Sequence, residues 1–382
     1  MQAQFKPHSK QSMTQTSDVI VIGAGIAGAS VAAELAADRS VTILEMEDRP
    51  GFHSTGRSAA TWLPTYGPPC VRALTRASGD FLKQPPVGFC ETPITSPRGE
   101  MLLGLPGQEE AIEECRSVGM QDITLEDARQ NIPLLRTDAI DCVLFDGTCL
   151  DIDVDALHQS YLRLFKKRSG SLHCNNPATA ISKRNGSWHV ATGQDNFEAP
   201  VLVNAAGAWC DEIAGMAGLP PIGLQPMRRS VALIPAPAGL NIDAWPVTAN
   251  AAITFYFKPQ SGMLLVSPAD ATPVDPHDAW ADDLALAEAI DQLQQYLDIE
   301  VTRIEHTWGG LRTFAPDGDL VVGFDPVADG FFWLAGQGGY GIQTSPALSR
   351  TAAALIAGHD IPADIAEHGV SAAPLSPARF VR

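Results

Sequence analysis

The sequence predicts an α/β (α+β) fold, in which a Rossmann-type nucleotide-binding domain carries an inserted mixed-sheet domain. Three observations lead to this prediction. A short apolar strand, an alanine-rich helix and a second apolar strand follow one another at 18–45. The same pattern of apolar strands and helices returns later, with a buried strand at 199–209 and a strand, glycine-rich turn and helix at 317–358. The segments 91–145 and 223–307 differ, because their apolar residues alternate and include aromatic residues. Alternating strands and helices are typical of a parallel sheet, and period-two alternation is typical of a separate sheet.

The first of these patterns is a β-α-β unit. Residues 18–23 (DVIVIG) predict a strand, 23–37 predict a helix with apolar residues at helical spacing, and 41–45 (VTILE) predict a second strand. The second strand ends in an acidic residue, Glu45. Strand, helix, strand and acid are therefore all present in the order that a nucleotide-binding unit requires.

Three glycines occupy the junction between the first strand and the helix. Gly23, Gly25 and Gly28 have the spacing G-x-G-x-x-G, and Glu45 follows about twenty residues later. The first glycine allows a tight turn, the second lets the backbone approach a pyrophosphate, and the third lets the helix pack on the strand. Glu45 would accept hydrogen bonds from ribose hydroxyls and disfavours the 2′-phosphate of NADP. The pattern predicts a dinucleotide site for either NAD or FAD.

The same patterns also predict how the chain is divided into domains. The Asn185-Gly186 pair between two alternating stretches predicts a hairpin, and the acidic stretch 277–298 predicts a helix. We expect a flexible N-terminus at 1–17, a discontinuous nucleotide-binding domain at 18–90, 146–222 and 308–377, and a substrate-binding domain at 91–145 and 223–307.

Composition narrows the class of protein. The chain of 382 residues has 26 Lys and Arg against 44 Asp and Glu, a net charge of −18 that disfavours nucleic acid as a partner. The seven Cys are scattered without metal-ligand spacing, so we expect reduced thiols, no metal and a cytoplasmic protein. Residues 1–17 lack the apolar region of a signal peptide, and no run reaches the roughly 18 apolar residues of a membrane span. We therefore expect no integral membrane segment.

Further motifs resemble a known enzyme family. GAGIAGAS, GFHSTGRSAA, VLVNAAGAWCD, LQPMRRS, FYFKP, GLRTF, PDGD and AGQGGYGIQTS follow one another along the chain. Their order resembles the FAD-dependent D-amino-acid oxidase and glycine oxidase superfamily, and within it the D-arginine dehydrogenases. The resemblance covers nearly the whole chain from about residue 18 to about 377. It implies FAD as the cofactor of the Rossmann-type domain.

The resemblance also implies which residues hold the cofactor. In the family, the loop matching 54–61 lies against the pyrophosphate and the flavin ring, where small residues let backbone N–H groups approach and Arg57 can neutralise charge. The loop matching 335–345 passes close to the ring, and the helix that follows points its N-terminus at the flavin N1–C2=O edge. Neither loop contains Cys, so we expect non-covalent FAD. The cofactor residues implied are Gly23, Gly25, Ala27, Gly28, Glu45, Met46, Ser54, Thr55, Gly56, Arg57, Ser58, Ala59, Ala60, Thr61, Ala178, Gly207, Gly338, Gly339, Tyr340, Gly341, Ile342 and Gln343.

Oxidation of an amino acid by a flavin depends on orientation more than on acid–base catalysis, because the Cα hydride passes to flavin N5 once the amine is neutral. We therefore expect no acid–base residue. By the resemblance, Arg229, Arg312, Tyr256 and Tyr66 bind the α-carboxylate, the Gly339 carbonyl receives the amine, and Glu100 pairs with a cationic side chain.

The chain departs from the family pattern at one point near the substrate. Thr61 stands where the D-arginine dehydrogenases have a His, and the next three residues, 62–64, also differ. We interpret His53 as structural. The expected activity is oxidation of D-amino acids, with D-Arg and D-Lys favoured in a broad range, to an imino acid and then to a 2-oxo acid and ammonia.

The alternatives left open are a glycine- or sarcosine-type amine oxidase that uses O2, a nicotinamide-dependent dehydrogenase and a non-catalytic flavin-binding protein. A small-molecule amino acid is the expected partner in the leading case. A quinone and a carrier protein are the alternatives left open for its electron acceptor.

Overall fold

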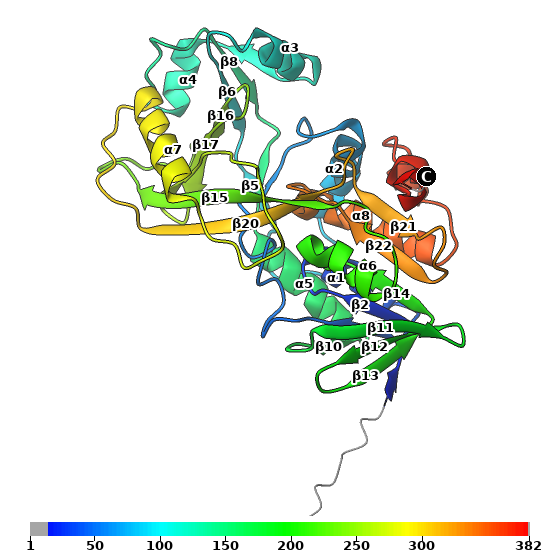
Figure 1. Ribbon diagram of the computed structural model, residues 1–382. Helices are drawn as coiled ribbons and strands as arrows, with labels where there is room; N and C mark the ends of the chain where they lie inside the picture. Colours follow the sequence, from blue (N-terminus) through cyan, green and yellow to red (C-terminus); the bar gives the residue numbers. More distant parts are fainter. Residues whose placement is uncertain (1–13, 381–382) are drawn as a thin grey trace, which may run out of the picture.

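The structure, a computed structural model, describes residues 14–380. Two large sheets dominate it (Figure 1). One has six strands in the order β10-β3-β2-β14-β22-β21, and the other has nine strands. The predicted fold class is confirmed, since a parallel sheet covered by helices is combined with a separate mixed sheet.

The six-stranded sheet forms because its central strands β3, β2, β14 and β22 are short apolar runs that are buried on both faces. Its parallel strands are β2 (Val19–Ile22), β3 (Val41–Leu44), β10 (Ser171–His173), β14 (Val201–Asn204) and β22 (Phe331–Ala335), and β21 (Val321–Phe324) is antiparallel to β22. The helices α1 (Ile26–Leu35), α5 (Val154–Lys167), α8 (Gly341–Ile356) and α2 (Pro69–Lys83) pack together beside it. Helix α1 therefore begins where β2 ends, as the glycine fingerprint predicts.

The nine-stranded sheet lies at the upper left of Figure 1, with helices α3 (Glu109–Ser117), α4 (Leu125–Asn131) and α7 (Asp283–Tyr296) around it. Its strands are β6 (Glu100–Gly104), β7 (Gln121–Ile123), β8 (Cys142–Asp146), β15 (Gln225–Pro235), β16 (Val247–Asn250), β17 (Tyr256–Gln260), β18 (Met263–Ser267), β19 (Thr272–Pro273) and β20 (His306–Phe314). Strand β20 pairs with β15 along its whole length. Residues 308–314 thus join this sheet, although the sequence suggested that they belong to the nucleotide-binding segment.

A four-stranded sheet of β1 (Thr14–Thr16), β11 (Ala178–Arg184), β12 (Ser187–Thr192) and β13 (Asn196–Ala199) packs at the other end of the molecule. Asn185 and Gly186 make the predicted hairpin turn with φ of 51° and 86°. Strand β1 pairs in parallel with β13, so residues 14–16 are not the flexible terminus that the sequence predicted. The N–H of Ser17 likewise donates to the Glu198 carbonyl at 3.0 Å, and residues 1–13 of that prediction lie outside the described residues.

Shorter elements complete the structure. They are the three-stranded sheet of β4 (Thr61–Trp62), β5 (Thr95–Pro97) and β9 (Leu150–Ile152), the helices α6 (Cys210–Met216), α9 (Ala363–Ala366) and α10 (Ala372–Leu375), and the 3-10 turns η1 (Gly207–Trp209) and η2 (Pro377–Phe380). Among residues 14–380, no helix combines the length and the apolar character needed to span a bilayer.

Candidate active site

A cavity of about 560 Å³ lies between the six-stranded and nine-stranded sheets. Its walls come from the turn after β2, the end of β3, loop 51–61, strands β15, β17 and β20, and loop 337–343. This volume is typical of cofactor and substrate sites, and the position at the carboxyl ends of parallel strands is the usual place for them.

The glycine fingerprint shapes one end of this cavity. A Cβ on Gly28 would lie 1.9 Å from the Gly23 carbonyl oxygen, and Gly23 itself has a φ of +98°. Gly28 lets α1 approach β2, and Gly25 lines the cavity. The backbone N–H of Ala24 donates to Glu45 Oε2 at 2.8 Å. The acid at the end of β3 is thereby fixed beside the phosphate-binding turn, where each of its oxygens keeps a further acceptor position.

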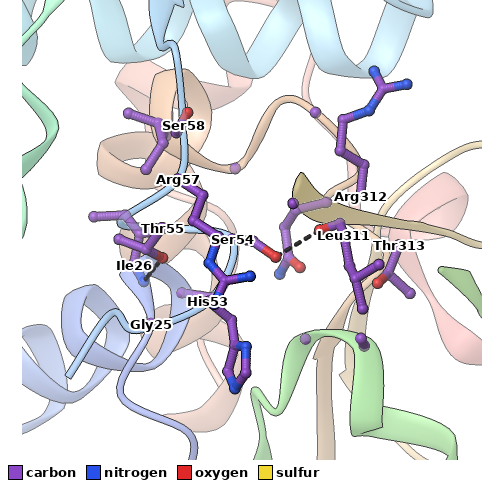
Figure 2. A pocket seen from close by; sticks show the side chains of 18 of the residues that line it. Gly25, Ile26, His53, Ser54, Thr55, Arg57, Ser58, Leu311, Arg312 and Thr313 are labelled. Atoms are coloured by element: carbon purple, nitrogen blue, oxygen red, sulfur yellow. Dashed lines mark hydrogen bonds between the residues drawn. The ribbon is translucent and has the colours of Figure 1, made fainter. Parts of the chain in front are cut away.

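Loop 51–58 connects the glycine turn to the other sheet. Thr55 Oγ1 accepts the Ile26 N–H at 2.9 Å, and Ser54 Oγ donates to the Leu311 carbonyl of β20 at 2.5 Å, as Figure 2 shows. Both contacts use the small polar residues that make this stretch unusual in the sequence. The loop is therefore held at both sheets, with its backbone along the cavity.

Arg57 connects loop 51–58 to the nine-stranded sheet. Its guanidinium forms an ion pair with Asp278 and donates to the carbonyl oxygens of Ala279 at 2.8 Å and Gly309 at 3.1 Å. Trp308 Nε1 donates to the Arg57 carbonyl at 3.0 Å. Asp278 is thus paired with Arg57, and the side chain ties loop 51–58 to the nine-stranded sheet. Arg57 also lines the cavity, and its role beside the cofactor stays a prediction.

The loop before α8 supplies buried donors. Gly338 has a φ of +51°, and Gln343 in the first turn of α8 accepts the Leu63 N–H at 2.9 Å. Gln343 Nε2 and Gln337 Nε2 are buried without a hydrogen-bond partner among the described residues, and both side chains line the cavity. Buried amide groups without partners are costly, so these atoms fit a bound group with acceptor atoms, such as a flavin ring.

Most of the predicted residues lie together in this cavity. Those that do not line it are Gly28, Gly56 and Tyr340. A Cβ on Gly56 would lie 2.6 Å from the Gly51 carbonyl oxygen, so this glycine permits a tight turn. The ring of Tyr340 packs edge-on against Tyr66 at 5.2 Å between centroids. These three residues shape the walls instead of lining the cavity.

Two arginines face the cavity from neighbouring strands. Arg229 of β15 and Arg312 of β20 both line it, together with Tyr256, Tyr66 and Gly339. The Arg229 guanidinium lies 5.8 Å from the centroid of the Tyr256 ring. Burial, and then the neighbouring Arg229 charge, lowers the pKa of Arg312. Arg312 Nε is buried with no partner among residues 14–380. This end of the cavity therefore suits an anionic group.

Glu100, the first residue of β6, lies at the cavity wall and is 7% exposed. Burial raises the pKa of Glu100 to about 7, the Asp146 charge adds to the rise, and the Thr65 hydroxyl, which donates to Oε2 at 3.5 Å, opposes it. Pairing across the sheet places Asp146 directly opposite on β8. A cationic ligand beside Glu100 would stabilise its charged form.

Lys258 is a cavity residue that the sequence analysis missed. It is 3% exposed, and its Nζ lies 2.5 Å from Asp151 Oδ1, while Arg98 Nε donates to Asp151 Oδ2 at 2.6 Å. The signal was present, because Lys258 follows Tyr256 by two residues and so shares its face of β17. Other cavity residues were missed as well. Trp209 and Gln337 stand in the quoted motifs VLVNAAGAWCD and AGQGGYGIQTS, whereas Asn176 and Met216 belong to no motif.

His53 Nε2 is hydrogen-bonded to Glu47 Oε1 at 2.8 Å, and its ring packs at a tilt against Trp209 with ring centroids 4.6 Å apart. It lines the cavity as part of its wall. Within residues 14–380, no group of three or more His, Cys, Asp or Glu side chains is arranged to hold a metal ion.

Comparison with known proteins assigns the family. FAD-dependent oxidoreductase domain-containing protein 1 of Bos taurus is 24% identical over 90% of this chain and 81% of its own length. The structure of glycine oxidase from Geobacillus kaustophilus matches 97% of this chain and all of its own with a TM-score of 0.83 at 20% identity. The structure of L-amino acid deaminase from Proteus vulgaris matches 98% of this chain and 97% of its own with a TM-score of 0.76 at 18% identity.

The family model described as FAD dependent oxidoreductase matches residues 18–355. That range contains the glycine turn, loop 51–61, both arginines and loop 337–343, which together surround the cavity. The chain belongs to the FAD-dependent oxidoreductase family, and its cofactor is FAD.

Proposed function

We propose that the protein is an FAD-dependent D-amino-acid dehydrogenase that favours basic side chains within a broad range. The observation that carries this proposal is the pair Arg229 and Arg312, which lie beside Tyr256 and the Gly339 loop in the same cavity as the glycine turn. A planar guanidinium can bind a carboxylate through two hydrogen bonds, and charge-assisted bonds contribute about 1.5–3 kcal/mol each.

The proposed roles follow from the positions of the side chains. Arg229, Arg312, Tyr256 and Tyr66 hold the α-carboxylate, and the Gly339 carbonyl accepts a hydrogen bond from the amine. FAD, when bound, accepts the hydride of Cα at N5, which leaves an imino acid that water hydrolyses to a 2-oxo acid and ammonia. The protein contributes orientation, since fixing Cα at the reacting atom removes much of the entropic barrier.

We also infer that FAD is held non-covalently between the two large sheets. No cysteine among the described residues lines the cavity, so no thioether to the flavin can form there. The buried amides of Gln337 and Gln343 supply unpaired donors to the ring instead. FAD should therefore be released when the protein is denatured in acid, and it should appear in the supernatant after the chain is precipitated.

The carboxylate site is tested by a matched pair of amines. D-Arg and its decarboxylated analogue agmatine carry the same guanidinium and differ in the carboxylate. Anaerobic mixing with the holoenzyme should bleach the flavin absorbance with D-Arg and leave it nearly unchanged with agmatine. Equal rates with both compounds would show that the arginine pair does not bind the carboxylate.

The side-chain preference is tested at Glu100. An ion pair to the substrate side chain in a desolvated site is worth roughly 1–3 kcal/mol, which is about tenfold to a hundredfold in specificity. Glu100→Leu should lose that factor for D-Arg and D-Lys while sparing D-Leu and D-Met. An equal loss on all four substrates would contradict the role of Glu100 as the selector.

A further inference from the structure

The cavity arginines Arg229 and Arg312 place two positive charges close together. The register of β15 and β20 pairs Arg229 with Gly310 and Met227 with Arg312, so the arginines are diagonal neighbours on one face. Like charges at such positions repel each other, and the low dielectric of a half-buried site strengthens the effect. A single substrate carboxylate can satisfy both guanidinium groups more easily if one of the two charges is already offset.

An acidic residue occupies a gap in the hydrogen-bond ladder beside Arg229. Strand β15 pairs with β18 from Ala232 onward and with β19 up to Arg228, so residues 229–231 face the connecting loop. In this gap the Ser230 N–H donates to Asp270 Oδ1 at 2.6 Å, and the Ser230 hydroxyl donates to Asp270 Oδ2 at 2.9 Å. The Asp270 side chain thereby replaces a missing strand partner, and its position is fixed.

The same residue holds Arg229. Arg229 Nε donates to the Asp270 backbone carbonyl at 2.7 Å, and it lies 3.9 Å from the carboxylate oxygen Oδ1. The side chain of Asp270 is only 11% exposed, so water screens this attraction weakly. The preceding residue, Ala269, has a φ of +52°, a conformation that L-residues rarely adopt and that belongs to the tight turn before Asp270.

Counting the charges gives the net charge of this face. Arg228 does not line the cavity; it is paired with Asp282 at 2.6 Å, and its Nε lies 3.7 Å from Asp270 Oδ2. Asp270 and Asp282 together offset the charges of Arg228 and Arg229, and Arg312 has no acidic partner within 4.0 Å among residues 14–380. The cavity therefore meets an entering ligand with about one net positive charge on two guanidinium groups.

We propose that Asp270 is a positioning residue that fixes Arg229 in the cavity and offsets its charge, so that the two arginines together bind one carboxylate rather than two. This inference rests on the proposed function and adds to it the selection of monocarboxylate over dicarboxylate ligands. Asp270 contacts no substrate itself and acts through Arg229.

The test uses Asp270→Asn, which keeps an acceptor for the Ser230 N–H and removes the charge. Acetate and malonate are titrated into the holoenzyme, and binding is followed by the flavin absorbance. The ratio of the acetate to the malonate dissociation constant should rise about tenfold in the variant, because the second carboxylate gains an uncompensated guanidinium. In anaerobic reduction by a D-amino acid, the limiting rate should fall about tenfold without a rise in the half-saturating concentration, because Arg229 is less well placed while the cavity is more positive.

Asp282→Asn is the matched control, since it also removes one negative charge near Arg228, at a carboxylate that is paired with Arg228 and not with Arg229. Its malonate preference should stay within twofold of the wild-type value. Ser230→Ala removes the hydroxyl bond to Asp270 Oδ2, together with the acceptor of the Asp282 N–H, and should give a smaller shift of the same sign as Asp270→Asn. An unchanged ratio in folded, FAD-loaded Asp270→Asn, or equal shifts in Asp270→Asn and Asp282→Asn, would overturn the proposal.

The proposed function fails in a different way. If Arg229→Met binds acetate as tightly as the wild type does, Arg229 is not a carboxylate ligand, and the proposed function is wrong before Asp270 is considered. If Arg229→Met weakens acetate binding while Asp270→Asn leaves the ratio and the limiting rate unchanged, only the role of Asp270 is wrong.

Discussion

Glu100 shows how burial sets the chemistry of a single residue. An acid 7% exposed on a strand beside Asp146 resists ionisation, and this raises the pKa of Glu100 to about 7. The carboxylate form is then available chiefly above neutral pH. A cationic ligand would supply the missing positive charge, which links the specificity of the cavity to pH.

The first prediction concerns stability. Because the pKa of Glu100 is higher in the folded than in the unfolded chain, the folded state binds the proton more tightly. The contribution of Glu100 to the free energy of unfolding is therefore complete below about pH 4.5 and is lost as the pH rises through about 7. Glu100→Gln should remove this loss and be more stable than wild type at pH 8 by roughly 1–3 kcal/mol, with little difference at pH 4.5. Urea denaturation of wild type and Glu100→Gln at both pH values measures the difference in the free energy of unfolding. The same difference at pH 8 and at pH 4.5 would contradict the prediction.

Arg312 gives a second prediction. Arg312→Met removes the guanidinium that has no acidic partner and keeps most of the apolar stem. Flavin reduction by D-amino acids should slow by about a hundredfold or more, because the carboxylate loses a charged partner, while the FAD content stays near normal. Arg228→Met, on the same sheet but outside the cavity, is the control. Loss of FAD from the Arg312 variant would mean that this arginine holds the cofactor instead.

The elements that form the cofactor site depend on close backbone approach. Helix α1 lies against β2 because Gly28 has no side chain to meet the Gly23 carbonyl oxygen. Loop 51–58 then connects this turn to β20 through Ser54 and Arg57. The two large sheets are thus connected at the cofactor site. A displacement of α1 would therefore change the shape of that site.

Gly28→Ala tests this arrangement. Its Cβ would lie 1.9 Å from backbone that cannot move freely, so α1 must shift away from β2. We expect a stability loss of about 1–3 kcal/mol or more, together with weaker FAD binding. Gly193→Ala is the control, since a Cβ there meets nothing within 4 Å. Thermal unfolding and the ratio of FAD to protein measure both effects. Normal FAD retention in Gly28→Ala would refute the argument.

Local patterns were sufficient for some elements but not for others. Apolar runs and three glycines predict β2, α1 and β3, because neighbouring residues determine those elements. The pairing of β20 with β15 joins segments some eighty residues apart and was not predicted. The partner of Arg57, Asp278, is 221 residues away in sequence, so this ion pair depends on tertiary structure and could not be predicted. The cavity face of Lys258 could have been predicted from strand alternation, since Tyr256 had already been assigned to that face.

At the scale of the whole molecule, the two large sheets contribute different parts of the cavity wall. The six-stranded sheet supplies the glycine turn and Glu45, the nine-stranded sheet supplies Arg229, Arg312 and Tyr256, and the cavity lies where they meet. Membership of the FAD-dependent oxidoreductase family is consistent with this division. The central claim is that the cationic end of the cavity orients an amino acid so that one Cα face meets the cofactor.

Anaerobic mixing of the FAD-loaded protein with D- and L-enantiomers of Arg, Lys, Leu and Met, followed by flavin absorbance, tests that claim most directly. With the carboxylate and amine fixed, exchange of the remaining Cα substituents turns the hydride away from N5. The account predicts rapid bleaching by the D-enantiomers, fastest with D-Arg or D-Lys, and slow or no bleaching by the L-enantiomers. Faster bleaching by L-amino acids, or no bleaching by any amino acid in the panel, would contradict it.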